Sequence, residues 1–556
     1  MLIRSNEISP DDTNTLRSAG DPFDEKRRII DRGIARLEES IRVLKSRRNE
    51  LSPISCLPVE ILCNIFKLSL IESHWQARSP DSWTNFSQVS QHWRTSALSA
   101  PELWTNIPFN YPRWAQEMLI RSKMAKLTIR YYTRPFLETP GPLTIEIVRS
   151  CLYEMNRVAE INFDGIPGLI LEEIFRDLPK SAPQLRTLRL RSCYSEIPFS
   201  IHDDFLYDTK ILKNVELFDC KISWDSQLLT DLTRLKLQRS LKANSSIIQV
   251  LHALKRMPAL TVLYLIDSIP DNLEGLSTCP VVDLPCLRIL VISSGVGSLT
   301  AVLRHITFPS SATLFLNCEE NQSIQIDFSN FLSVLATKFL STFVIQSLSL
   351  RTFNGNMDDI EFRLSTTAHL TSLLLESQLQ LTLKWPSSQP HNYVKALTCA
   401  FDAMCLSFLT QLQISTSYHI DSQTWVKTLG KLPLLERVCV QSSALCPFLE
   451  ALVFKTKVAE ESEAAYHNVS FPKLRYIHLE ATEFLTRRRV ELIDTLLDCL
   501  MERYERNAEV QVLRLDNCYD ISPNEVERLK EVVVDVIWDG IEKELESEYH
   551  FSDSDE

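Results

Sequence analysis

Apolar residues recur along most of this chain in the pattern L-x-x-L-x-L, with other aliphatic or aromatic residues replacing some leucines. The middle leucine returns every 20 to 39 residues, and the longer steps require insertions such as the polar stretch Lys455 to Ser470. The copies are Leu185-Leu188-Leu190, Leu212-Val215-Leu217, Leu232-Leu235-Leu237, Leu260-Leu263-Leu265, Leu287-Leu290-Ile292, Ile345-Leu348-Leu350, Leu370-Leu373-Leu375, Leu409-Leu412-Ile414, Leu435-Val438-Val440, Leu474-Ile477-Leu479 and Val510-Leu513-Leu515. Leu314-Leu316 is a weaker copy, and Met124-Leu127-Ile129 and Val158-Ile161-Phe163 are candidates for the opening units.

Each copy predicts a short strand followed by a helix or an irregular return. One such unit cannot cover its own apolar edge, so neighbouring units must stack and bury the leucines in a continuous core. The expected fold class is therefore α/β, a curved solenoid with parallel strands on its concave face. We expect the last repeat to lead into a helix over Asn524 to Ser547 that caps the open end.

A second regularity follows the last apolar position of each copy by three residues. Small residues that can hydrogen-bond to neighbouring turns dominate there, as in leucine-rich repeats. They are Cys193, Cys220, Ser240, Ser268, Ser417, Ser443, Thr482 and Cys518. The pattern therefore resembles leucine-rich repeats in more than leucine content, and it gives Cys193, Cys220 and Cys518 a structural role.

The residues that flank the last two apolar positions point out of the sheet, because side chains alternate along a strand. They are basic in early repeats, apolar in middle repeats and polar in late repeats. The predicted target-binding residues on this concave face are Arg189, Arg191, Arg234, Lys236, Tyr264, Ile266 and Phe315. Grouped exposed apolar residues indicate a binding surface. The alternative is that long loops cover the middle strands.

The chain before the repeats has a different pattern. Residues 1 to 22 are polar without a period, which predicts disorder. Residues 24 to 51 predict one helix, because apolar residues from Ile30 to Leu51 alternate at steps of four and three, and Glu38 can pair with Arg42. This helix is either a short coiled coil or a surface helix that packs on the helices that follow.

Two further helices are predicted beyond it. Pro58 and Glu60 suit the first turn of a helix. An apolar stripe follows from Ile61 to Phe66, and a second helical run from Trp83 to Ala97 carries large apolar residues on one face. A unit this short buries itself poorly, so it needs the rest of the chain or a partner.

These residues resemble an F-box, whose pattern is Leu-Pro-x-Glu, an apolar helix, and then Val-Ser-x-x-Trp-Arg. The matching positions are Leu57, Pro58, Glu60, Ile61, Ile65, Phe66, Val89, Ser90, Trp93 and Arg94. The closing segment Ala100 to Ile107 resembles the tail of F-boxes in mushroom-forming fungi. The segment Ser69 to Asp81 is longer and more polar than the usual F-box carries. An ordinary helical hairpin within the core is the alternative.

The resemblance is to a fungal F-box protein with C-terminal leucine-rich repeats. It implies a non-catalytic substrate-recognition subunit of an SCF-type ubiquitin ligase. The F-box would bind a Skp-family adaptor through Leu57, Pro58, Glu60, Ile61, Ile65, Phe66, Val89 and Trp93, and through it a cullin–RING ligase, while the repeats would bind an unknown target protein. The alternatives are a leucine-rich-repeat scaffold or small-GTPase regulator, and an F-box protein that joins no ligase.

The composition of the chain argues against several classes of function. The net charge of -12 argues against general nucleic-acid binding, and no apolar run is long enough to span a membrane. The 14 cysteines form no C-x-x-C pair, the histidines lack ligand spacing, and the 11 glycines make no phosphate-binding loop. We therefore expect no metal, no cofactor and no catalytic site. The polar start predicts no signal peptide, so a cytoplasmic or nuclear location is expected.

The expected organisation has five parts. It runs as a disordered start over 1–22, a helix or short coiled coil over 23–52, an F-box domain over 53–107, a leucine-rich-repeat-like solenoid with a capping helix over 108–546, and an acidic disordered tail over 547–556.

Overall fold

The structure is a computed structural model of the chain. It describes residues 22–73, 85–133, 140–193, 198–202, 204–240, 244–276, 279–319, 328–340, 343–354, 357–367, 377–386, 392–416, 422–430, 432–442, 444–453, 470–485 and 492–543. Several predictions from the sequence lie outside these residues: disorder before Pro22 and after residue 546, the start of the second helical run at Trp83, the repeat at Leu370 and the insert from Lys455.

The chain divides into two compact units, Met1–Leu127 and Thr128–Glu556. We refer to them as the N-terminal unit and the sheet unit. Most regular elements of the N-terminal unit in the described residues are helices. These are α1 (Pro22–Glu50), η1 (Pro53–Cys56), α2 (Val59–Ser73), α4 (Phe86–Val89), α5 (Gln91–Ser99), η2 (Pro101–Trp104) and α6 (Pro112–Arg121).

The sheet unit holds a sheet of sixteen strands among the described residues, and β1 begins at the boundary between the units. Its strands are β1 (Leu127–Tyr132), β2 (Val158–Ile166), β3 (Thr187–Ser192), β5 (Asn214–Phe218), β7 (Arg234–Gln238), β8 (Val262–Ile266), β10 (Ile289–Gly295), β12 (Thr313–Glu319), β13 (Ser347–Asn354), β14 (Met357–Ser365), β15 (Leu379–Pro386), β16 (Gln411–Thr416), β17 (Arg437–Ser442), β18 (Tyr476–Glu480), β19 (Val512–Asp516) and β20 (Asp535–Trp538). Two small sheets pair β4 (Phe199–Ser200) with β6 (Cys220–Lys221) and β9 (Val282–Asp283) with β11 (Ile306–Thr307).

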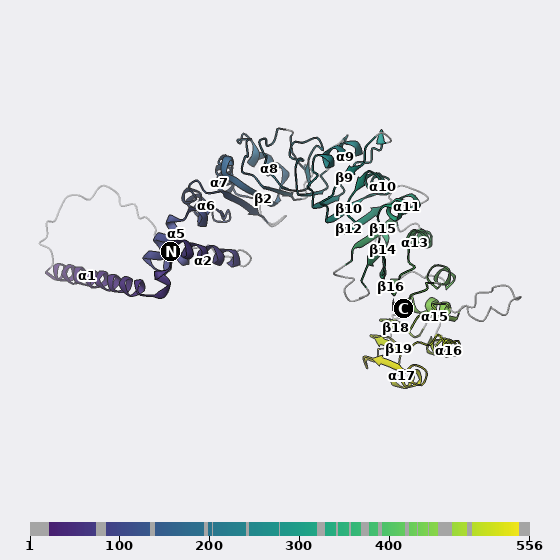
Figure 1. Cartoon of the computed structure of the whole chain (residues 1–556). Coiled ribbons are helices and arrows are strands. Elements are labelled where there is room, and N and C mark those ends of the chain that lie inside the picture. Colours follow the sequence, from purple (N-terminus) through teal and green to yellow (C-terminus); the bar gives the residue numbers. More distant parts are fainter. Residues whose placement is uncertain are drawn as a thin grey trace, which may run out of the picture. The chain divides into compact units, whose positions relative to one another are not determined.

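Helices connect many of these strands and lie along one side of the large sheet (Figure 1). They are α7 (Pro142–Tyr153), η3 (Met155–Arg157), α8 (Gly168–Phe175), α9 (Ile247–Lys255), α10 (Val296–His305), α11 (Ser329–Lys338), α13 (Asn392–Ala403), α14 (Ser422–Thr424), the π-helical turn η7 (Trp425–Leu429), α15 (Leu445–Val453), α16 (Leu492–Glu505) and α17 (Pro523–Lys530). The other side of the sheet, opposite these helices, is called the open face below.

Strand pairing is mostly parallel, and it follows the chain order except at one place. The order is β1-β2-β3-β5-β7-β8-β10-β12-β15-β14-β13-β16-β17-β18-β19-β20. Parallel neighbours joined through a return segment are what stacked strand–helix units produce. The mixed α/β fold and the largely parallel sheet therefore agree with the prediction and fit an α/β repeat solenoid.

The exception is an antiparallel insert that the repeat pattern did not predict. Strand β14 runs antiparallel to both β13 and β15, so β12 pairs with β15 and not with β13. In β14, Ile360, Phe362 and Leu364 are buried and alternate with polar residues. This period of two is the ordinary signal of a strand, but it does not fit L-x-x-L-x-L.

Strand alternation places the repeated leucines in the core, as predicted. In β7 and β8 the buried positions are Leu235, Leu237, Leu263 and Leu265, each at most 1% exposed. Their neighbours in sequence are half-buried on the open face. The strands align in register, so the leucines of one repeat lie beside those of the next.

In several repeats the small residue after the strand contacts the neighbouring repeat through its side chain, as the pattern predicts. The Sγ atom of Cys220 lies 3.6 Å from the carbonyl oxygen of Leu190, Ser240 Oγ donates to that of Leu217 at 3.1 Å, and Cys518 Sγ lies 3.4 Å from that of Leu479. In each case the acceptor belongs to the last leucine of the preceding repeat. The residue just before the small residue has a positive φ in five repeats, at Asp219, Arg239, Asp267, Ala481 and Asn517. A recurring left-handed turn therefore ends these strands.

The C-terminal end differs from the expected capping helix over Asn524 to Ser547. The helix α17 is short and ends at Lys530, and the strand β20 follows and pairs in parallel with β19. Ser522 and Glu525 form a capping box at the start of α17, which fixes where the helix begins. The alternating burial of Asp535–Trp538 is typical of an edge strand.

Candidate functional site

The helix α2 in the N-terminal unit is apolar on two faces. Leu62, Cys63 and Phe66 point into the core and are at most 8% exposed. On the other side lie Ile61, Ile65 and Leu68, which are 47, 37 and 64% exposed. We call these three residues the outer face of α2. Ile61, Ile65 and Leu68 are four and three residues apart, so they form one stripe along the helix.

The core beneath α2 is aromatic. The ring of Phe66 stacks on Phe86 with a centroid distance of 4.7 Å and lies 5.1 Å from Trp93. Trp104 contacts Phe86 at 6.4 Å, and its indole nitrogen donates to the carbonyl oxygen of Ala97 at 2.9 Å. The guanidinium group of Arg121 covers the Trp104 ring at 4.7 Å. This packing fixes the orientation of α2 from inside and leaves its outer face to solvent.

Trp93 reaches this core because the predicted second helix is broken in two. The helix α4 ends at Val89, and α5 begins after Ser90, whose φ of -154° is extended. The backbone N–H of Trp93 donates to Ser90 Oγ at 3.1 Å, the usual N-cap arrangement. The apolar pattern predicted one continuous helix from Trp83 to Ala97. It did not indicate that Ser90 caps the start of a second helix.

The structure separates the predicted adaptor-binding residues into two groups. Pro58, Glu60, Ile61, Ile65 and Val89 are exposed, and Leu57 is half-buried. Pro58 lies just before α2, and its carbonyl oxygen accepts the first helical hydrogen bond, from the N–H of Leu62 at 3.1 Å. These residues are available to a partner.

Phe66 corrects the prediction of direct contact, whereas Trp93 lies where it can brace the anchor, as expected. Phe66 is 1% exposed, and Trp93 is partly buried against the same cluster. Neither ring can contribute most of its surface to a partner while this core is intact. Their role is to support α2, whereas Leu68, which the sequence did not single out, belongs to the exposed stripe. The rule that identified Ile61 and Ile65 would have found Leu68 three residues further along.

The helix α1 does not cover this stripe and leaves its own apolar residues exposed. Ile30, Leu37 and Leu44 are 61, 67 and 63% exposed. Of the two roles predicted for this helix, packing of its apolar residues on the helices that follow is therefore not seen in the described residues. Arg42 forms an ion pair with Glu39 at 2.6 Å and not with the predicted Glu38.

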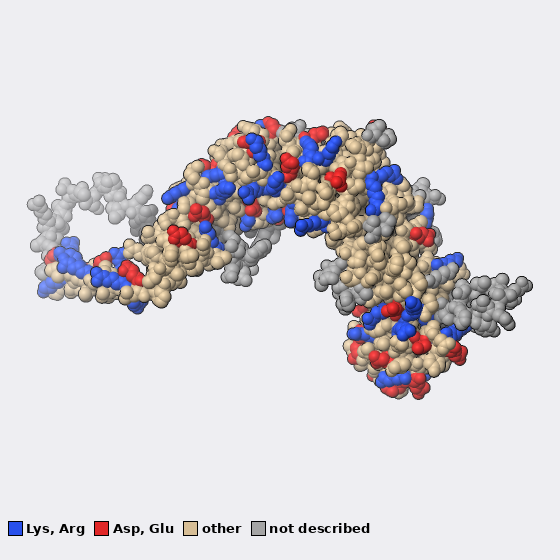
Figure 2. Space-filling view, viewed as in Figure 1, with Lys and Arg blue, Asp and Glu red and all other residues tan. Residues whose placement is uncertain are grey.

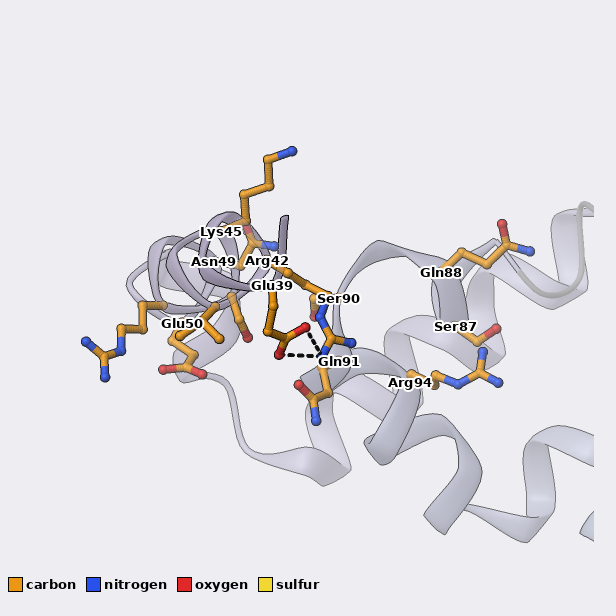
Figure 3. Close-up of a pocket in the computed structure, with 13 residues that line it drawn as sticks. Glu39, Arg42, Lys45, Asn49, Glu50, Ser87, Gln88, Ser90, Gln91 and Arg94 are labelled. Carbon is orange, nitrogen blue, oxygen red and sulfur yellow. Dashed lines mark hydrogen bonds and ion pairs between the residues drawn. The ribbon is translucent and has the colours of Figure 1, made fainter. Parts of the chain in front are cut away.

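A polar groove separates α1 from the chain around α4 and α5. It is lined by residues of α1 and by Ser87, Gln88, Ser90, Gln91 and Arg94. Figure 3 shows Arg42 turned onto Glu39 beside Gln91. Val43 is the one aliphatic residue among the described residues that line the groove, and the groove is open to solvent, so it does not enclose a ligand as typical binding pockets do.

The second candidate surface is the open face of the sheet unit, where the structure places all seven predicted target-binding residues. Arg189, Lys236, Tyr264 and Phe315 occupy one row across neighbouring strands, and Arg191 and Ile266 occupy the next row. Arg234 lies one row earlier, opposite Asn214. The alternation rule therefore assigned these side chains to the correct side of the sheet.

The face is less basic than the sequence suggested. Glu216 on β5 lies between Arg189 and Lys236, at 3.2 and 3.7 Å from their nitrogens. Arg191 is 3.7 Å from Asp164 and covers the ring of Phe218 at 4.4 Å. On the side of the sheet unit that Figure 2 shows, basic and acidic side chains are likewise interspersed. Glu216 flanks Val215 and Leu217, so the same alternation rule predicts it.

The middle of the open face carries an apolar row. Tyr264, Val291 and Phe315 lie on the adjacent strands β8, β10 and β12 in one register. All three are half-buried. Together with Ile266 they form an apolar segment beside the mixed charges, as the sequence predicted.

Comparison with known proteins supports the first of these two surfaces. Residues 54–110, about a tenth of the chain, match the F-box-like family. The comparison with curated proteins found no match. No helix in the described residues has the length and apolar character needed to cross a membrane.

Solved structures were also compared. The crystal structure of the Rad7 and Elc1 complex in yeast aligns over 83% of this chain and 98% of that chain, with 13% identity and a TM-score of 0.29. A TM-score this low carries no argument about fold or partner. The F-box-like match runs from within η1 to beyond η2 and contains the whole outer face of α2. The chain therefore carries an F-box-like domain at residues 54–110.

Proposed function

We propose that this chain is the substrate-recognition subunit of an SCF-type ubiquitin ligase. The F-box-like domain binds a Skp-family adaptor, which links it to a cullin–RING ligase, and the open face of the sheet unit binds the target. The subunit itself is not catalytic and acts by holding a target lysine near the conjugating enzyme. It would work in the cytoplasm or nucleus.

The observation that carries this proposal is the outer face of α2. It is an apolar stripe that the N-terminal unit leaves exposed, it lies inside the segment that matches the F-box-like family, and an aromatic core holds it in place. Burying each such side chain against a partner contributes about 1.5–3 kcal/mol. A few such residues are enough for a specific interface centred on α2.

The direct test is co-purification from cells with the full chain as bait. The expected result is recovery of a Skp-family adaptor together with a cullin, and Leu57→Ala with Pro58→Ala should sharply reduce both while the melting temperature of the sheet unit stays unchanged. Recovery of the adaptor without cullin would make the chain an F-box protein outside ligases. If the double variant still recovers the adaptor and the cullin at wild-type levels, the proposed contact of Leu57 and Pro58 with the adaptor is refuted.

A further inference from the structure

Three side chains with metal-binding atoms meet on the open face near the C-terminal end of the sheet. Cys439 lies on β17 and His478 and Glu480 lie on β18, and one donor atom from each falls within 4.8 Å of the other two. Parallel pairing creates this cluster, because Cys439 is directly opposite His478 and Gln441 is opposite Glu480. Thiolate, imidazole and carboxylate are the ligand types that zinc takes in proteins.

The distance between the first two donors suits a shared ion. Cys439 Sγ lies 3.4 Å from His478 Nδ1. Ligands at about 2.3 Å for sulfur and about 2.0–2.1 Å for nitrogen in a tetrahedral site are separated by about 3.6 Å. A thiol–imidazole hydrogen bond can have a similar length, so a second observation is needed to distinguish the two.

That observation is the carboxylate behind the imidazole. His478 Nε2 lies 2.9 Å from Asp516 Oδ2 on β19, and the same oxygen accepts a hydrogen bond from Arg514 Nε at 2.6 Å. Because a carboxylate can only accept, Nε2 carries the proton, and in the neutral imidazole the lone pair is then on Nδ1, the nitrogen beside Cys439. Histidines that bind metals are usually oriented by a carboxylate in this way.

A cysteine nucleophile is the rival explanation, since Cys439, His478 and Asp516 also follow the order of a cysteine–histidine–acid triad. Cys439 is 3% exposed. Reactive cysteines are at least partly exposed, whereas a buried thiol is inert toward substrates. A buried thiol can still bind an ion that the neighbouring donor atoms of His478 and Glu480 share.

We propose that Cys439, His478 and Glu480 bind a single Zn²⁺ ion on the open face, and that Asp516 is a positioning residue for His478. The ion would tie β17 to β18 across the 39 residues that separate Cys439 from His478 in the sequence. Three protein ligands leave a fourth position for water or for a side chain of a bound protein. This inference does not depend on the proposed function, because the F-box-like domain contributes no ligand.

Cobalt titration of the full chain tests the site. The protein is stripped with a chelator under reducing conditions and titrated with Co²⁺, whose thiolate complexes absorb in the near-ultraviolet. We expect one equivalent to produce this band and Zn²⁺ to remove it. Cys439→Ser should abolish the band, His478→Gln should weaken Co²⁺ binding more than 100-fold, and Asp516→Asn should weaken it about 10–100-fold.

Cys220→Ser is the matched control. Cys220 is also a buried cysteine at the sheet, but its Sγ contacts backbone carbonyl oxygens, so the cobalt band should be unchanged. A band that survives Cys439→Ser would mean an adventitious ion only and would overturn the proposal. If Cys439→Ser does not fold, X-ray absorption of the zinc-loaded wild type decides: one sulfur ligand at about 2.3 Å supports the site, and nitrogen and oxygen ligands alone refute it.

Discussion

At the scale of single residues, neighbours on one strand have opposite roles. Leu263 is fully buried between the strands of adjacent repeats, whereas Tyr264 is half-buried on the open face. Leu263→Asp would bury a carboxylate with no partner, at a cost of several kcal/mol, or force it to remain protonated. We expect insoluble protein or a much lower melting temperature.

Tyr264→Asp is the control for that substitution, because it introduces the same carboxylate one position away on the solvent side. Its melting temperature should stay within a few degrees of the wild type. Thermal melting of both variants checks the register of β8. Equal stability of the two would mean that Leu263 is not a core position.

The repeat pattern and the alternation of apolar and polar residues predicted most strands of the sheet. They could do so because a strand that is buried on one side needs an apolar residue at every second position. The ion-pair partners of the basic residues on the open face could not be predicted in the same way. Glu216 sits on a strand that the pattern had located, but its pairing with Arg189 and Lys236 depends on which strands are neighbours. The same holds for Cys439, His478 and Asp516, which come from three strands far apart in sequence.

At the scale of elements, the break between α4 and α5 positions the aromatic core. Ser90→Ala removes the side-chain acceptor for the N–H of Trp93 and should destabilise the start of α5 by about 1 kcal/mol. Hydrogen–deuterium exchange of the α5 amides should become faster by about a factor of five. Ser90→Asp keeps a capping oxygen and should exchange like the wild type; if Ser90→Ala also exchanges like the wild type, the cap contributes nothing.

Two elements of the sheet unit differ from the predictions, and both lie where the local sequence does not follow the repeat pattern. The strand β14 follows a period of two without the L-x-x-L-x-L spacing, and β20 replaces the end of an expected capping helix. The helix α2 was predicted correctly, but the sequence could not tell which of its apolar residues face inward. That division depends on the tertiary contacts of Phe66 with Phe86 and Trp93.

At the scale of the whole molecule, the proposed target surface combines mixed charge with an apolar row. Replacing Arg189 or Lys236 by Glu would place like charges beside the buried Glu216, so neutral substitutions are the cleaner test. Arg191→Gln, Arg234→Gln and Lys236→Gln together should reduce target capture while adaptor binding is unchanged. Capture by the wild type should also fall with added salt, because these charges are partly exposed.

The matched control changes the net charge equally on the other side of the sheet unit. Lys255, Lys395 and Lys427 are exposed lysines on α9, α13 and η7, and their replacement by Gln should leave capture unchanged. Captured proteins are compared by quantitative mass spectrometry. An unchanged set in the open-face variant would move recognition elsewhere, for example to the insert from Lys455 to Ser470.

The affinity of the purified full chain for a purified Skp-family adaptor, measured by calorimetry, tests the central claim most directly. We predict one-to-one binding by the wild type and binding more than 100-fold weaker for Ile61→Asp with Ile65→Asp, since each anchor residue contributes about 2 kcal/mol. Leu143→Asp with Leu169→Asp changes two comparably exposed residues of the sheet unit and should bind like the wild type. Absence of binding by the wild type, or equal affinity of the α2 variant, would contradict the account.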